Sequence, residues 1–132
     1  MPMSNYLKDK LRRHVFGTAA YAKPTQFHFA LFTVPPTAAG GGTEVVAPSY
    51  ARVRRDPGDA NWNFPASTGE ANNIADIQYA APAESWGVAV AQGMFDESGN
   101  FLGWENLINP KTINAGDTAP KFAATTYKAV FG

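Results

Sequence analysis

The sequence predicts a mainly β protein, an antiparallel β-sandwich or flattened barrel preceded by a short N-terminal α-helix. The apolar segments are short, and turn signals rich in Gly, Pro, Asn and Asp recur between them at fairly regular spacing. One apolar stripe of helical period precedes these segments. With 132 residues the chain has the length of one domain. We therefore expect a single domain over 1–132, with the helix in 1–17 and the sandwich in 27–132.

An amphipathic helix is expected over residues 5–16. Three apolar residues recur there at the i, i+4 and i+8 spacing of one helix face: Leu7, Leu11 and Val15. Ser4 or Asn5 can cap the start of the helix, and Gly17 is a natural stop. A helix of about three turns is marginal alone. Its apolar stripe should therefore dock on this domain or on a neighbouring subunit.

An aromatic strand and an extended loop follow the helix. Residues 27–34 are apolar on both strand faces, which indicates a central strand covered on each side. Residues 35–49 form the loop, which contains three consecutive glycines, Gly40, Gly41 and Gly42. A phosphate-binding loop would continue with Lys-Ser or Lys-Thr and a helix, whereas Thr43-Glu44 follows here. A surface loop or arm is the favoured interpretation.

Residues 50–55 predict a half-exposed strand with a basic face, formed by Arg52, Arg54 and Arg55. Such a run could bind a polyanion. Aromatic side chains for base stacking are not interleaved on the same face, so a solvated face or an inter-subunit salt bridge is favoured. No specific nucleic-acid partner is expected.

The centre of the predicted sandwich is a hairpin over residues 86–104. Its two apolar arms, 86–95 and 101–104, are joined by the polar turn 96–100, in which Gly99 can adopt positive φ. We expect Phe95 in the core. The remaining predicted elements are an edge segment at 62–65, a strand at 74–79, a turn at Asn109-Pro110, a short strand at 111–113 and a final strand at 122–131.

Charge is unevenly distributed along a chain of zero formal net charge. Residues 1–55 carry eight basic and two acidic residues, and residues 56–132 carry three basic and nine acidic ones. This asymmetry can mark a nucleic-acid or acidic partner. Neutralisation within the fold or between copies is the favoured interpretation.

No residue pattern indicates catalysis, a metal or a cofactor. Cysteine is absent, and His14 and His28 have no ligand partners at suitable spacing. A Ser-His-Asp arrangement is spatial and stays open, yet no serine has the Gly-X-Ser-X-Gly context. The Asp96-Glu97 pair is better explained by turn solubility than by glycoside hydrolysis or Ca²⁺ binding. No apolar run approaches the roughly 20 residues that span a bilayer, so no membrane partner is expected.

Several of these segments together resemble a known family. They are an N-terminal Ser-Asn-Tyr-Leu helix, Leu31 to Thr37, Ala38 to Val45, Tyr50-Ala51-Arg52, Trp86-Gly87, Gly93 to Asp96 and Pro110 to Asp117. Their order and content resemble small virion structural proteins of tailed bacteriophages, often labelled tail-fibre or capsid-decoration-like. The resemblance spans nearly the whole chain.

The resemblance implies a β-sandwich with an N-terminal helix, present in symmetric copies on a virion and without a catalytic site. A capsid decoration or cement protein is the favoured expectation. A collar or tail-fibre component is an alternative. Another alternative is a carbohydrate-binding module on the host-facing surface, which could use Trp62, Trp86 and Trp104 as an aromatic platform.

The resulting hypothesis is assembly. We expect a homo-oligomer, with a trimer favoured and a dimer possible, or binding to the major capsid protein or another virion protein, after synthesis in the host cytoplasm. The expected interface combines the helix stripe, the arginine strand and the glycine loop: Leu7, Leu11, Val15, Arg52, Arg54, Arg55, Gly40, Gly41 and Gly42.

Overall fold

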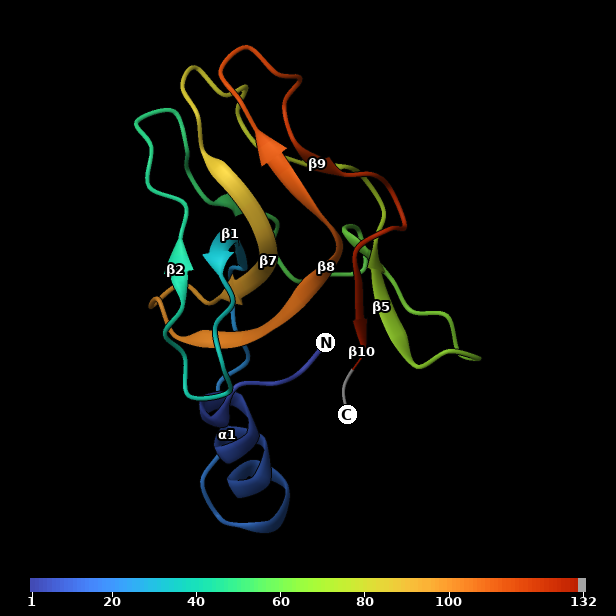
Figure 1. The fold of residues 1–132 in the computed structure, drawn as a ribbon. Helices are drawn as coiled ribbons and strands as arrows, with labels where there is room; N and C mark the ends of the chain where they lie inside the picture. Colours follow the sequence, from blue (N-terminus) through green and yellow to red (C-terminus); the bar gives the residue numbers. More distant parts are fainter. Residues whose placement is uncertain (131–132) are drawn as a thin grey trace.

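The structure, a computed structural model, describes residues 1–130, which form one N-terminal helix and a set of antiparallel strands (Figure 1). The elements are α1 (Asn5–Phe16), β1 (His28–Val34), β2 (Thr43–Glu44), β3 (Val53–Arg54), β4 (Trp62–Asn63), β5 (Glu70–Asn73), β6 (Ile77–Gln78), β7 (Gly87–Phe95), β8 (Phe101–Ile113), β9 (Lys121–Phe122) and β10 (Lys128–Val130). The predicted class, mainly β with a leading helix, is confirmed.

The strands form one larger sheet and two small ones. The larger sheet has the order β2-β1-β7-β8, and β3 also pairs with β1. The small sheets are β10-β5-β4 and β6-β9, and every pairing is antiparallel. The described sheets stay open and do not close into a barrel. The small sheets pack against the larger one, and this packing forms the sandwich.

The core lies between these sheets. Phe29, Met94 and Leu102 point inward from β1, β7 and β8 of the larger sheet, and they belong to one buried cluster with Trp62 and Tyr127. The ring centroids of Phe29 and Tyr127 are 4.9 Å apart in an edge-to-face arrangement, a favoured geometry for aromatic pairs. Burial of each such side chain contributes roughly 1.5–3 kcal/mol. This aromatic contact joins the two layers.

The predicted hairpin is confirmed as β7 and β8. Gly99 adopts φ +81° in the turn, and the Asp96 carboxylate accepts hydrogen bonds from the backbone N–H groups of Ser98 and Asn100. The prediction for Phe95 is wrong in its face. Successive side chains of a strand point to opposite faces of the sheet. Met94 faces the core, so Phe95, the next residue, lies half-buried on the outer face.

The predicted turn at Asn109-Pro110 is wrong, because β8 continues through it. Ala89 pairs with Lys111 and Ala91 pairs with Asn106, so residues 107–110 form a bulge opposite a single residue of β7. Proline has no N–H to donate, and a bulge leaves that position unpaired. The bulge therefore accommodates Pro110 inside a strand.

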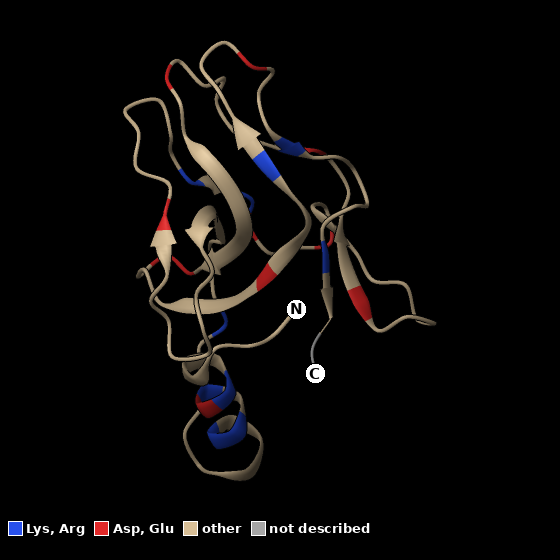
Figure 2. Cartoon of the chain, in the orientation of Figure 1, with Lys and Arg blue, Asp and Glu red and all other residues tan. Residues whose placement is uncertain are grey.

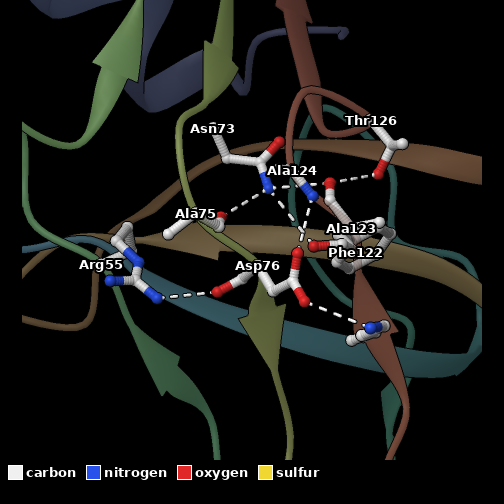
Figure 3. A network of polar contacts seen from close by, with 9 residues as sticks. Arg55, Asn73, Ala75, Asp76, Phe122, Ala123, Ala124 and Thr126 are labelled. Atoms are coloured by element: carbon white, nitrogen blue, oxygen red, sulfur yellow. Dashed lines mark hydrogen bonds and ion pairs between the residues drawn. The ribbon is translucent and has the colours of Figure 1, made fainter.

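The predicted final strand over 122–131 is also wrong, since a turn divides it into β9 and β10. Figure 3 shows the main reason: the buried Asn73 side chain donates to the carbonyls of Phe122 and Ala123. The same side chain also accepts from the N–H of Tyr127. Thr125 adopts φ +67° within this turn. The end of that prediction, residue 131, lies outside the described residues.

Other boundaries differ less. The predicted strand at 50–55 is ordered as a strand only over Val53–Arg54, and the one at 74–79 only over Ile77–Gln78. The strand Glu70–Asn73 lies between the predicted segments at 62–65 and 74–79, where no strand was predicted. The predicted edge segment at 62–65 is confirmed as β4, the edge of its small sheet.

Candidate functional site

Helix α1 projects from the body of the sheets and is attached by its first turns (Figure 1). Ser4 caps it: its hydroxyl accepts from the Leu7 N–H at 3.1 Å, and its own N–H donates to the Leu102 carbonyl at 2.9 Å. Met3 bridges to Gly103 at the edge of β8. The sequence at 1–4 thus ties the start of the helix to the larger sheet.

The apolar stripe of α1 is divided by this attachment. Leu7 is buried in the core of its own chain, and Leu11 is partly buried against the same cluster. Val15 is 67% exposed, and Phe16 beside it is 89% exposed. The helix therefore uses its first apolar residues for its own fold and presents two apolar side chains at its tip.

The projecting helix is also basic. It carries four Lys or Arg residues against the single acid Asp9 (Figure 2). Asp9 pairs with Arg12 and, at 2.9 Å, with Arg13. The hydrogen bond from Arg12 contributes most to lowering the Asp9 pKa below its ordinary value. Lys8 and Lys10 form no ion pair among residues 1–130, so the helix presents positive charge beside its apolar tip.

The three predicted arginines each have a partner inside the chain. Arg52 forms an ion pair with Glu44 at 2.8 Å, and Arg54 forms one with Asp56 at 2.7 Å. Arg55 donates to the backbone carbonyl of Asp76 at 2.8 Å. This arginine run thus links neighbouring segments of the sandwich, and its charge is largely compensated locally.

Glu44 occupies the most buried of these pairs. Burial by itself raises the pKa of the Glu44 carboxyl, but hydrogen bonds from Arg52 and from the Tyr50 hydroxyl outweigh it and hold the pKa below its ordinary value. The Tyr50 hydroxyl also accepts from the Leu31 N–H of β1. This carboxylate therefore connects β2, the segment before β3, and the central strand.

The glycine loop is packed next to the start of α1. Gly40, Gly41 and Gly42 all adopt positive φ, between +74° and +95°. A Cβ at Gly42 would lie 2.6 Å from the Val34 carbonyl oxygen, whereas one at Gly41 would meet open space. The Asn5 N–H donates to the Ala38 carbonyl. The structure thus brings the predicted loop and the predicted helix together, and Glu44 in the same loop pairs with Arg52 of the arginine run.

Two concave surfaces were missed at the level of sequence. One is an apolar cavity of about 270 Å³, here called the Trp62 pocket, lined among others by Phe27, Trp62, Phe64, Ala71, Met94 and Tyr127. The other is a cavity of about 470 Å³ between β8 and the β9–β10 segment, here called the lysine groove, lined by Lys111, Lys121 and Lys128 with Glu105, Asn106 and Asn109. Both combine segments distant in sequence, so no local pattern could reveal them.

The tryptophans do not share one surface. Trp62 and Trp86 are buried in separate clusters, and Trp104 is half-buried against Phe101 on the outer face of the larger sheet. Across residues 1–130, no three His, Asp or Glu side chains gather as a metal site would require. Within the same residues, no helix is long and apolar enough to cross a membrane.

Comparison with known families identifies the chain. A family model described as podophage GP4 fiber I protein gp80 matches residues 2–129. The chain belongs to this fiber I family. A comparison with curated proteins found no match. The resemblance to virion structural proteins of tailed phages, stated from the sequence segments, is thereby confirmed.

Membership of the fiber I family makes the chain a virion structural component. The matched range includes α1, both concave surfaces and every described strand up to the middle of β10. The projecting helix and the sheets that carry it therefore belong to the fiber I domain itself.

Proposed function

We propose that the chain is a non-enzymatic subunit of a podophage tail fibre that assembles as a symmetric homo-oligomer through the tip of α1. The exposure of Val15 and Phe16 at the end of a projecting helix supports this proposal most strongly. Exposed apolar side chains that gather on a protruding element are typical of protein interfaces. A fibre position is proposed ahead of capsid decoration because the family description names a fibre protein.

Assembly partners follow from the same surface. A closed trimer is the favoured symmetry, with a dimer as the alternative, since homo-oligomers usually have closed point-group symmetry. The basic helix would be attracted to acidic surfaces of a neighbour and would set the orientation of encounter. The neighbour is a second copy or another virion protein, and synthesis and assembly take place in the host cytoplasm.

A non-enzymatic role is supported by the use of the acidic side chains. The Asp96 carboxylate caps the β7–β8 turn, Glu44 is held by Arg52 and Tyr50, and Asp76 accepts from Lys121 and the Ala124 N–H. Each of these carboxylates has backbone or side-chain partners that stabilise the fold.

The test is location on the particle. A short epitope inserted in the exposed turn 66–69 can be labelled with an antibody on intact phage and imaged by cryo-EM. Label on the tail fibres is the expected result. Label distributed over the head would support capsid decoration, and particles without label at either place would contradict a virion role. The untagged phage is the matched control.

A further inference from the structure

The Trp62 pocket is an apolar cavity with a buried floor and an exposed rim. Met94, Tyr127 and Ala129 are each at most 8% exposed, while Phe64 on the rim is 62% exposed. An apolar cavity of roughly 150 Å³ is enough to hold benzene. The Trp62 pocket, at about 270 Å³, therefore has room for the ring of a phenylalanine.

The pocket walls suit an aromatic guest. Phe27 and Trp62 already meet edge-to-face, with ring centroids 6.3 Å apart, and Trp62 contacts Tyr127 in a similar arrangement at 6.0 Å. The Trp62 indole N–H is satisfied by the Asp56 carbonyl at 3.0 Å, so it requires nothing from a guest. A further ring would extend the same edge-to-face packing.

The chain itself carries a side chain of this kind. Among the residues described, Phe16 and Phe64 are the exposed phenylalanines, and Phe64 already forms the pocket rim. Phe16 lies at the end of the projecting helix and is 89% exposed, so it does not fill the pocket of its own molecule. It is presented where another molecule can reach it.

We propose that Phe16 of one copy inserts into the Trp62 pocket of the next copy, which joins subunits head to tail. This inference rests on the homo-oligomer of the proposed function and names its contact. The two surfaces differ, so the contact is heterologous, and repetition with the correct rotation closes a ring such as a trimer. Phe16 acts as the buried aromatic anchor of that interface.

Charge supports the same pairing. The helix behind Phe16 carries four basic residues and one acidic residue. Asp59 lies on the pocket lining and forms no ion pair among residues 1–130, and the one cation of the lining is Lys23. An approaching basic helix thus meets the unpaired carboxylate of Asp59 at the pocket, which favours its docking orientation.

The experiment uses variants that block each side separately. Phe16→Ser removes the anchor, and Ala71→Phe fills the pocket. Phe64→Lys is a second pocket variant, because it alters an exposed rim residue, leaves the core intact and adds a charge that repels the basic helix. Ile108→Ser is the matched control, since Ile108 is 97% exposed and lies neither at the tip of α1 nor in the Trp62 pocket. Circular dichroism melting checks folding, and sedimentation equilibrium measures mass over a concentration series.

We expect wild type and Ile108→Ser to be oligomeric, and Phe16→Ser to weaken association at least about tenfold, as for a binding hot spot. Ala71→Phe and Phe64→Lys should weaken it similarly. A mixture of Phe16→Ser with Ala71→Phe should form a one-to-one dimer and nothing larger, because one intact tip and one intact pocket remain.

A mixture that stays monomeric would overturn the head-to-tail contact, as would single variants that remain oligomeric like the wild type. A wild type that is monomeric at every concentration would also overturn it. These outcomes leave the fibre location untouched, because that is decided by labelling the particle. Failure of the contact and failure of the proposed location are therefore distinguishable.

Discussion

The guanidinium carbon of Arg52 lies 3.7 Å from the centre of the Phe95 ring while its nitrogens bind both carboxylate oxygens of Glu44. Phe95 in turn stacks against Phe32 and contacts Phe101. One arginine therefore fastens the segment before β3 over an aromatic row on the outer face of the larger sheet. The sequence predicted that Arg52 lies on a solvated or partner-facing surface. In the structure, its charge instead stabilises contacts within the fold.

The Arg52–Phe95 contact should show measurable coupling. In a double-mutant cycle of Arg52→Met and Phe95→Leu, urea unfolding should give a coupling free energy of about 0.5–1 kcal/mol. Arg54→Met combined with Phe95→Leu is the control and should be additive, since Arg54 pairs with Asp56. Additivity in the Arg52 cycle would mean that the stacked geometry contributes nothing.

Truncation of Phe95 should still destabilise the protein. A fully buried phenylalanine costs about 3–5 kcal/mol on truncation to alanine. Because Phe95 is only half-buried, we expect about 2–3 kcal/mol for Phe95→Ala, measured by chemical denaturation. A cost equal to that of the core variant Phe29→Ala would show that the outer aromatic row is covered as completely as the core.

Acid stability should depend on Glu44. The pKa of Glu44 is lower in the folded chain than its ordinary value. Its contribution to folding stability is therefore complete above the unfolded pKa of about 4.3, and it disappears as pH falls through the folded pKa. Thermal melts should therefore show a loss of stability below roughly pH 5 that is smaller in Glu44→Gln. Glu97→Gln, which removes one exposed carboxylate elsewhere, is the matched control.

Asn73 should be among the costliest polar residues to replace. It is fully buried and donates to the carbonyls of Ala75, Phe122 and Ala123 (Figure 3). It also accepts from the N–H of Tyr127. Asn73→Ala removes the acceptor of the Tyr127 N–H and the donor to the three carbonyls, of which that of Ala123 keeps its hydrogen bonds from Thr126. Each buried group left unpaired costs about 1–3 kcal/mol. We expect about 3–4 kcal/mol in total and a Tm lower by roughly 10 °C. The exposed Asn63→Ala should cost under about 1 kcal/mol.

The glycine loop offers a matched pair of substitutions. Gly41→Ala and Gly42→Ala both place a side chain at positive φ, which costs about 1–2 kcal/mol. Gly42→Ala adds a clash with the Val34 carbonyl, so it should cost about 1–3 kcal/mol more. Equal melting temperatures for the two variants would mean that the loop moves away from β1 readily.

The elements that sequence predicts well are those whose signal is local. The spacing of Leu7, Leu11 and Val15, the cap at Ser4 and the stop at Gly17 predict α1, and they coincide with its observed bounds. The apolar arms and the polar turn around Gly99 likewise predict the hairpin. In both elements the residues that decide the structure lie within a few positions of one another.

The wrong predictions have causes distant in sequence. Pro110 ordinarily ends a strand, but the register against β7 makes room for it in a bulge. The strand expected at 122–131 is divided because Asn73, about fifty residues earlier, binds the carbonyls of the turn. The same holds for the Trp62 pocket, whose lining is drawn from β4, β5, β7 and β10. The exposure of Val15 and Phe16 could not be predicted from the sequence either, because it depends on where the helix docks.

The bulge at 107–110 limits the backbone pairing that β8 could offer to other chains. Beyond the Met3–Gly103 bridge, β8 is the outer strand of its sheet, and a straight outer strand is a template on which other chains can add without limit. Here Pro110 removes a backbone donor, the bulge bends the strand and Lys111 adds charge. In the proposed fibre oligomer, this edge of the sheet would thus resist indiscriminate backbone pairing, which leaves side-chain contacts to determine the order of assembly.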